Sequence, residues 1–307
     1  MAKDAHDPKD PSSSAEHGAA KAIAPGLYIV ATPIGNLEDI TLRALRILRS
    51  VDRIACEDTR QTQKLLSHFG IAVPTVSCHA HNERERADEL IAELKGGARI
   101  AMVSDAGMPG ISDPGEYLVA QAVAAGIPVI PIPGASAVVS ALAASGLDTT
   151  SFLFVGFPPP RTGERRSFYE TLRSERATLI FYEAPHRVVE SLRDAIQIFG
   201  AERQAVLARE ITKIHEEFLR GTLREIEAVC ASRNLLRGEM TLLVAGANPA
   251  DSTSADAAPT SDLRGAMAVY LGQGLDEQAA LKRVARDRGV SKSEVYREWQ
   301  REPGRRK

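Results

Sequence analysis

Short apolar runs alternate with segments of helical periodicity along residues 26–248, and no other feature of the chain restricts its fold as much. The runs are four to eight residues long and rich in β-branched residues, which is typical of strands. The segments between them carry apolar residues three and four positions apart, as in Ala87, Leu90, Ile91 and Leu94. Strands that alternate with helices indicate α/β domains, in which helices cover a largely buried sheet.

The expected strands form two successive sets. The first set occupies residues 27–31, 53–56, 74–78, 98–104 and 127–132. The second set occupies residues 152–157, 177–182, 203–210 and 239–246. Because 307 residues are enough for two ordinary domains, the sequence predicts one α/β domain at 26–147 and a second at 148–247.

Two polar segments without periodicity flank this α/β region. Residues 1–25 have the composition of a disordered leader, and residues 248–261 have that of a linker. The remaining residues, 262–307, are expected to form a separate helical module. The first residues lack the basic start and the long apolar core of a signal peptide, so we expect a cytoplasmic protein.

A stretch of 31 residues without a formal charge, 117–147, exceeds the length of a membrane-spanning helix. Glycines and prolines interrupt its middle, at Gly126, Pro128, Pro131, Pro133 and Gly134. A helix through these positions would lose hydrogen bonds and clash repeatedly. The stretch therefore predicts a helix, a buried strand, a tight turn and a second helix.

The three cysteines, Cys56, Cys78 and Cys230, lie far apart in the sequence. Their spacing matches no metal-ligand motif, so we expect no structural metal site. An odd number of scattered cysteines is typical of reduced thiols in the cytosol.

Loops that follow strands are the places to look for a ligand, because ligands of open α/β sheets gather at the carboxyl ends of strands. The loop at 104–115 has three glycines and two prolines, and twelve residues exceed the usual length of a connection. Such a loop either presents its backbone to a small polar ligand or is a plain tight connection. Neither a dinucleotide fingerprint nor a phosphate-binding P-loop is present.

Further strand ends point to the same crevice. Segment 32–36 precedes an expected helix that Asn36 caps, and Ser136 either caps another helix or faces the crevice. In the second domain, the strand ends at 156–160, 182–187 and 208–213 carry charges of both signs. Together they predict a cleft between the two domains.

Nine segments, in this order, resemble one known family: VATPIGNLEDITLRAL, ACEDTR, HAHNERER, SDAGMPGISDPG, PIPGASA, FVGF, YEAPHR, AREITK and GEMTLLVAG. They resemble the ribosomal RNA small subunit methyltransferase I family, which is a branch of the tetrapyrrole methylase fold. The resemblance covers residues 26–248, and the order of many motifs makes a chance match very improbable. One departure is Met108, where we expect a threonine in this family.

The resemblance implies an activity, a cofactor and an assembly. Members transfer a methyl group from S-adenosylmethionine to the ribose 2′-hydroxyl of a cytidine in 16S rRNA, which tunes the decoding centre of the small ribosomal subunit. They bind the cofactor between their two α/β domains and are usually homodimers. Carried onto this chain, the cofactor-binding residues are Pro33, Ser104, Asp105, Ala106, Gly107, Pro109, Ile111, Ser136 and Phe157.

A ribose hydroxyl is a weak nucleophile, so a nearby group is expected to accept its proton or to stabilise the alkoxide. The matched motifs supply His81, Glu83, Glu210 and Lys213 as catalytic candidates, with Asp58 as a further acid. Each of these residues has a structural alternative, because Asp58 and Glu210 also have basic neighbours with which to pair.

The C-terminal end is basic. Residues 281–307 contain ten basic and four acidic residues, a net charge of +6, so the rest of the chain carries −8 of the total of −2. Two amphipathic helices joined at Gly289, the second capped by Ser291, form a helix-turn-helix outline. We expect RNA contacts from Arg283, Arg286, Lys292 and Arg297, and packing against the α/β body is the alternative.

Two rival functions belong to other classes. A small-molecule tetrapyrrole methyltransferase shares the fold and the cofactor but has no evident use for a basic module. A non-catalytic RNA-binding protein uses the module but does not need the cleft.

Overall fold

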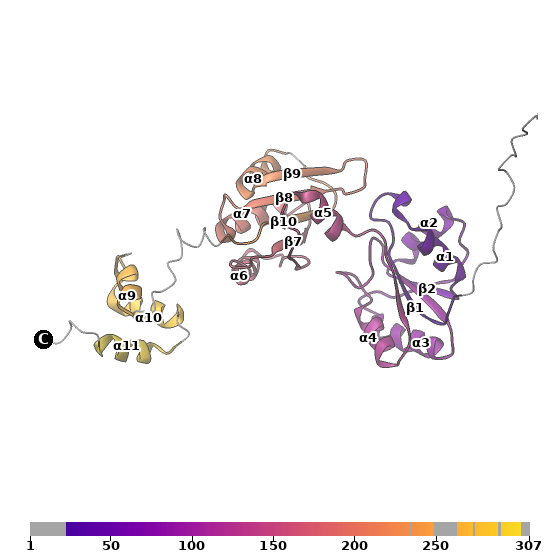
Figure 1. The fold of residues 1–307 in the computed structure, drawn as a ribbon, viewed down its shortest axis with the longest axis horizontal. Helices are drawn as coiled ribbons and strands as arrows, with labels where there is room; N and C mark the ends of the chain where they lie inside the picture. The colour runs from indigo at the N-terminus through magenta and orange to yellow at the C-terminus, as the bar shows by residue number, and fades with distance from the viewer. Residues whose placement is uncertain (1–22, 234, 249–262, 273, 288–289, 302–307) are drawn as a thin grey trace, which may run out of the picture.

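The computed structural model describes residues 23–233, 235–248, 263–272, 274–287 and 290–301 (Figure 1). Within these residues the chain forms two five-stranded sheets, both covered by helices, and a C-terminal group of three helices. The α/β class and the helical C-terminal segment are therefore confirmed. The expected leader (1–25) and linker (248–261) lie almost entirely outside the described residues.

The first sheet is parallel and has the strand order β3-β2-β4-β1-β5. Its strands are β1 (Gly26–Val30), β2 (Arg53–Cys56), β3 (Thr75–Ser77), β4 (Arg99–Val103) and β5 (Val129–Ile132). The helices between them are α1 (Leu42–Ser50), α2 (Thr59–His68), α3 (Glu83–Lys95) and α4 (Glu116–Ala124). Buried side chains of α1 and α2 share one core cluster with the sheet, and those of α3 and α4 share another. The two helix pairs therefore cover opposite faces (Figure 1).

Strands β1 and β4 mark the point at which the chain changes direction across this sheet. They are neighbours, yet β1 leads into α1 on one face and β4 leads into α4 on the other. In open α/β sheets, ligands bind in the crevice between loops that diverge in this way. The topology thus singles out the loops at 31–36 and 104–115.

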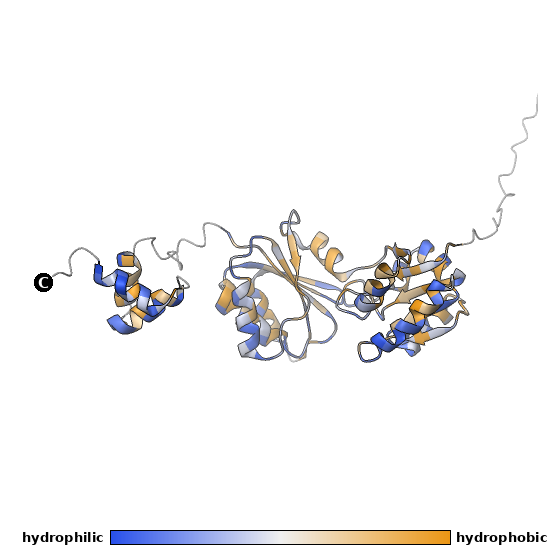
Figure 2. Cartoon of the chain, turned by 90° about the horizontal axis from the view of Figure 1, so that it is seen from below, coloured by the Kyte–Doolittle hydropathy of each residue, from blue (hydrophilic) through white to orange (hydrophobic). Residues whose placement is uncertain are grey.

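The second sheet is mixed, with the strand order β6-β7-β10-β8-β9; only β6 and β7 pair in parallel. Its strands are β6 (Phe152–Phe154), β7 (Thr178–Glu183), β8 (Gln204–Arg209), β9 (Glu217–Thr222) and β10 (Met240–Val244). Helices α6 (Thr162–Thr171), α7 (Val188–Phe199) and α8 (Leu223–Ala231) share a core with one face. Helix α5 (Ala137–Ser145) packs on the other face. Figure 2 shows that hydrophobic residues concentrate on the strands.

Helix α5 joins the two α/β parts closely. It lies before residue 147, within the range expected for the first domain, yet its Val138 and Leu142 cluster with Ile180 and Val206 of the second sheet. The loop residue Ile34 of the first part belongs to the same cluster. This shared core fixes the cleft between the two parts.

The uncharged stretch 117–147 folds as its interruptions predict. It contains most of α4, then β5, a turn and α5. One detail differs, because β5 lies at an edge of its sheet and is only partly buried. Among the described residues no helix is long and apolar enough to cross a membrane.

The C-terminal module consists of α9 (Leu263–Gly272), α10 (Glu277–Asp287) and α11 (Lys292–Arg301). Its buried residues form a core of their own, with Leu281 and Trp299 among its members. The expected cap of the last helix is confirmed. The Glu294 backbone N–H donates to Ser291 Oγ (3.3 Å), and the Ser291 N–H donates to Glu294 Oε2 (2.9 Å).

Candidate active site

A cavity of about 320 Å³ lies where the two α/β parts meet. Its wall is formed by Ile34, 106–108, 111–113, Ser136, Ala137, Phe157, 182–185, Ile211 and 238–241. These residues come from strand ends and loops of both sheets. Small-molecule sites usually measure about 300–1,000 Å³ and are mostly apolar with a few polar groups, and this cavity matches that description.

The loop at 104–115 is held by hydrogen bonds to the loop after β1. The backbone N–H of Thr32 donates to Gly107 O (2.9 Å), and that of Gly107 donates to Thr32 O (3.1 Å). The buried hydroxyl of Ser104 donates to Gly107 O (3.2 Å) as well. Gly107 has a φ of +84°, which L side chains rarely adopt. The two loops at the switch point therefore form one rigid wall.

Five of the nine cofactor-binding residues expected from the family line this cavity: Ala106, Gly107, Ile111, Ser136 and Phe157. Pro33, Ser104, Asp105 and Pro109 belong to the same loops but are not among the described lining residues. The Ser104 hydroxyl holds the loop through its hydrogen bond to Gly107 O. Asp105 Oδ1 accepts from the backbone N–H of Asp58 (3.3 Å). Met108, the departure from the family pattern, also lines the cavity.

The structure shows which of the two expected capping residues, Asn36 and Ser136, accepts a capping hydrogen bond. Ser136 precedes α5, but its side chain accepts no capping hydrogen bond within the described structure, and the residue lines the cavity. The Asn36 side chain does accept from the Glu38 N–H (3.1 Å), although the element it caps is only the short 3₁₀ helix η1 (Leu37–Asp39). Thr41 caps α1 instead.

None of the four catalytic candidates is among the described residues that line the cavity, and His81 and Glu83 differ in their surroundings. Glu83 Oε1 accepts from the backbone N–H groups of Gly115 (3.0 Å), Tyr117 (3.1 Å) and Leu118 (3.3 Å). This carboxylate therefore satisfies the start of α4, where helix geometry leaves N–H groups without partners. His81 is exposed, and its ring lies 6.0 Å from that of His79.

Glu210 and Lys213 form an ion-paired cluster at the edge of the cavity. Lys213 Nζ lies 2.8 Å from Glu210 Oε1 and 2.9 Å from Glu239 Oε2, and Glu239 lines the cavity. The hydrogen bond from Lys213 lowers the pKa of Glu210. A Cβ at Gly238 would lie 2.3 Å from the Glu210 carboxyl carbon, and a Cβ at Gly35 would lie 2.4 Å from the Lys213 side chain. Because Gly238 and Gly35 have no side chains, Glu210 and Lys213 can pack directly against their backbone, and the cluster extends across the cleft.

Asp113 is an acidic residue of the cavity wall that sequence reasoning missed, although it lies in the same glycine-rich loop. Burial raises its pKa to about 6, and the nearby Glu57 carboxylate contributes next. The preceding Ser112 has a φ of +62°. Non-glycine residues with such a backbone are strained and cluster at functional sites. Asp113 is therefore a carboxyl group poised to change protonation near neutral pH.

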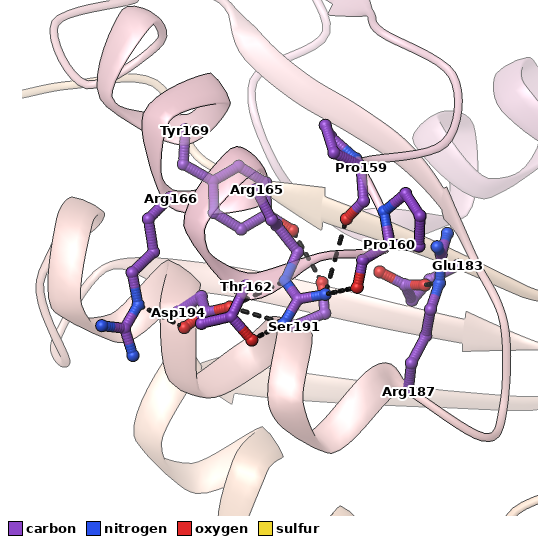
Figure 3. Close-up of polar contacts among 10 residues, drawn as sticks. All are labelled: Pro159, Pro160, Thr162, Arg165, Arg166, Tyr169, Glu183, Arg187, Ser191 and Asp194. Carbon is purple, nitrogen blue, oxygen red and sulfur yellow. Dashed lines mark hydrogen bonds and ion pairs between the residues drawn. The ribbon is translucent and has the colours of Figure 1, made fainter.

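Aromatic rings and a buried ion pair shape the other wall. Phe157 and Tyr182 line the cavity with ring centroids 5.4 Å apart. The loop after Phe157 is held by the buried Arg165, whose Nη1 donates to Pro160 O (3.0 Å) (Figure 3). Arg165 in turn pairs with the buried Asp194 at 2.6 Å. The ion pair thus positions the segment that carries Phe157.

The expected RNA-contacting side chains of the module are all exposed: Arg283, Arg286, Lys292 and Arg297. They lie on α10 and α11, whose apolar residues face the module core. Lys292 Nζ donates to Gln278 Oε1 (2.7 Å), and Arg297 Nε donates to Ser293 O (3.2 Å). The Lys292 and Arg297 side chains remain exposed despite these bonds, so their charges stay accessible to solvent.

Solved structures with a similar fold superpose over most of this chain. Uroporphyrin-III-C-methyltransferase from Thermus thermophilus superposes with a TM-score of 0.51 at 22% identity, covering 72% of this chain and 94% of that chain. Diphthine synthase superposes with a TM-score of 0.54 at 15% identity, covering 71% and 89% of the two chains. At these identities the likeness describes the fold alone.

Sequence comparison is more specific. The family model described as Tetrapyrrole (Corrin/Porphyrin) Methylases matches residues 26–227. Ribosomal RNA small subunit methyltransferase I of Halalkalibacterium halodurans is 49% identical over 281 residues, which cover 90% of this chain and 95% of that protein. The protein of the same name from Synechocystis is 46% identical over 88% of this chain and 95% of its own length. This chain therefore belongs to the ribosomal RNA small subunit methyltransferase I family of the tetrapyrrole methylases.

Proposed function

We propose that the protein transfers the methyl group of S-adenosylmethionine to the ribose 2′-hydroxyl of a cytidine in 16S rRNA of the small ribosomal subunit. The observation that carries the proposal is the cavity at the switch point, which combines the rigid loop 104–115 with the wall of a second sheet. The names of the close relatives support the substrate class. We also propose that the protein acts in the cytoplasm as a homodimer.

The residues of the cavity suit S-adenosylmethionine. The Phe157 and Tyr182 rings, tilted by 55° to each other, offer aromatic contacts to its adenine. Asp113 and Glu239 bring negative charge to a cationic ligand. The Oε2 atom of the buried Glu183 has no hydrogen-bond partner among the described residues, which leaves an acceptor at the wall.

The cofactor, when bound, supplies an activated methyl group on a positively charged sulfur. We propose that Asp113, as a carboxylate, accepts the proton of the 2′-hydroxyl, because it lies on the cavity wall and its raised pKa keeps it basic enough for this role. Lys213 and Glu210 are proposed to hold the Glu239 side chain at the edge of the cleft. His81 and Glu83 stay candidates from the sequence, with Glu83 already engaged at the start of α4.

The test is methyl transfer from labelled S-adenosylmethionine to purified small subunits, to naked 16S rRNA and, in a parallel reaction, to a tetrapyrrole, followed by mapping of any labelled nucleotide. The proposal expects a label on one cytidine ribose. Label in a tetrapyrrole but in neither RNA substrate would support the small-molecule alternative instead. Binding of RNA without any methyl transfer would support a non-catalytic RNA-binding protein.

Replacement of Gly107 by valine is expected to weaken S-adenosylmethionine binding by roughly 10–100-fold. A β-branched residue at a φ of +84° costs about 1–3 kcal/mol, and its Cβ would lie 3.5 Å from Ile34 Cγ2 of the cavity wall. Isothermal titration calorimetry measures the effect. Gly126→Val is the matched control, because Gly126 also has a positive φ (+69°) but lies outside the described cavity wall. Equal affinity of both variants for the cofactor would contradict the assignment.

A chain truncated after Asn248 is expected to bind S-adenosylmethionine normally and RNA less tightly. Each phosphate contact on single-stranded RNA contributes about −0.7 to the slope of log affinity against log salt. Loss of the four expected phosphate contacts of the module should therefore make the slope shallower by about 3. Filter binding at several salt concentrations measures this change. If truncation instead lowers thermal stability and cofactor affinity, the module packs on the α/β body.

A further inference from the structure

The two helix layers of the first α/β part carry opposite charge. Helices α1 and α2 contain five basic residues and no acidic one in their sequences: Arg43, Arg46, Arg49, Arg60 and Lys64. On the other face of the sheet, α3 and α4 contain six acidic and three basic residues, a net charge of −3. Figure 1 shows α1 and α2 on one side of the sheet and α3 and α4 on the other, so the sheet separates a basic layer from an acidic one.

Most of the positive charge on the basic layer is available to a partner. All five side chains are exposed. Arg60 is paired with Asp58 (2.9 Å), whereas Arg43, Arg46 and Lys64 have no ion-pair partner in the described part of the chain. An external anion gains little from a charge that is already ion-paired within the protein. Arg43, Arg46 and Lys64 are not ion-paired in the described part of the chain. They are therefore the side chains that an anionic partner would contact.

A shallow groove lies on this layer between α2 and the edge strand β3. It measures about 560 Å³ and is lined by Thr59, Arg60, Gln63, Lys64, Ser67 and Thr75. These side chains offer hydroxyl, amide and cationic groups, and the described lining contains no carboxylate. Hydroxyl, amide and basic side chains are the groups with which proteins contact phosphate and sugar.

The position of the layer links it to the cavity. In a parallel sheet the helix after a strand starts near the carboxyl edge, so Arg43 and Arg60, in the first turns of α1 and α2, lie towards that edge. The loops that form the cavity follow β1 and β4 at the same edge. Asp58, which caps α2, is hydrogen-bonded through its backbone to Asp105 of the cavity loop. A chain of phosphates on the basic layer would therefore lead towards the cavity.

We propose that the outer surface of α1 and α2, with its groove, is a docking surface for the RNA backbone, separate from the C-terminal module. Arg43, Arg46 and Lys64 contact phosphates, and the groove accommodates the adjoining sugar. This deepens the proposed function, because it states which face of the α/β body receives the RNA that enters the active site.

The test compares RNA binding of the full-length protein with that of the triple variant Arg43→Gln/Arg46→Gln/Lys64→Gln, by filter binding of 16S rRNA at several salt concentrations. We expect weaker RNA binding and a salt slope that is shallower by about 2, from three lost contacts at about 0.7 each. Affinity for S-adenosylmethionine should stay unchanged, because none of the three residues is among those that line the described cavity.

The control is a second triple variant with the same loss of charge, Arg84→Gln/Lys95→Gln/Arg224→Gln, located on α3 and α8. It should keep the wild-type affinity and slope. Equal slopes for the two triple variants would overturn the proposal, since only net charge would then matter. A loss of dimers in the first variant with unchanged RNA affinity would overturn it too, because the surface would be an interface between copies. Since these arms measure binding alone, they are independent of whether methyl transfer is observed.

Discussion

Replacement of Asp113 by asparagine is expected to slow methyl transfer by about 10²–10⁴-fold at saturating substrates, which is the usual contribution of a positioned general base. Asparagine has nearly the same shape and keeps the cavity wall intact, but it does not accept the 2′-hydroxyl proton. Single-turnover kinetics measures the step directly. The affinity for S-adenosylmethionine should change far less than the rate.

The pH dependence gives a second readout of the same residue. Asp113 acts only when it is ionised, and burial raises its pKa to about 6. The value of kcat/KM should therefore fall as the pH drops through about 6, because the free enzyme then becomes protonated at this site. The residual activity of Asp113→Asn should lack this step.

Asp88→Asn is the control, since Asp88 is an exposed residue of α3. Its rate and pH profile should match those of the wild type. A near-normal rate for Asp113→Asn, with the acidic step retained, would exclude Asp113 as the proton acceptor. His81, Glu83, Glu210 and Lys213 would then be the residues to test.

Replacement of Asp194 by alanine is expected to lower the free energy of unfolding by about 3–5 kcal/mol, which is the usual cost of removing one partner from a buried ion pair. Asp194 and Arg165 are 3% and 1% exposed, so the arginine would be left as an uncompensated buried charge. Asp194 also accepts from Arg166 Nε (2.6 Å), as Figure 3 shows. Urea denaturation at neutral pH measures the loss.

Glu164→Ala provides the comparison, on the helix α6 that carries Arg165. Glu164 pairs with Arg161 at 3.0 Å, but the two side chains are 55% and 82% exposed. Removing an exposed pair of this kind usually changes stability by less than about 1 kcal/mol. Similar losses for the two variants would show that burial of the Asp194 pair is unimportant.

The double variant Arg165→Met/Asp194→Leu separates stability from positioning. Replacing both partners of a buried pair by apolar residues is often neutral or stabilising, so unfolding should return towards the wild-type value. The hydrogen bonds from Arg165 to the carbonyls of Pro159 and Pro160 would still be lost. Binding of S-adenosylmethionine should therefore remain weaker than in the wild type, because the segment after Phe157 is no longer held.

The sequence by itself determined the class of the fold and most of its elements. Apolar periodicity is a local property, and it correctly predicted both sets of strands and the broken helical character of 117–147. It missed β9, because this edge strand is only half-buried and contains the polar residues Glu217, Arg220 and Thr222. The motif order also identified the family, which no single motif would do.

Only the tertiary structure decided which residues share the cavity. Asp113 and Glu239 are 126 positions apart in the sequence, and both line it because α5 and Ile34 join the core of the second sheet. The same folding brings Glu83 to the start of α4 and Arg165 to the segment after Phe157. A local pattern reports which face of a helix or strand is apolar. It does not report which distant loops meet, since that depends on the packing of whole elements.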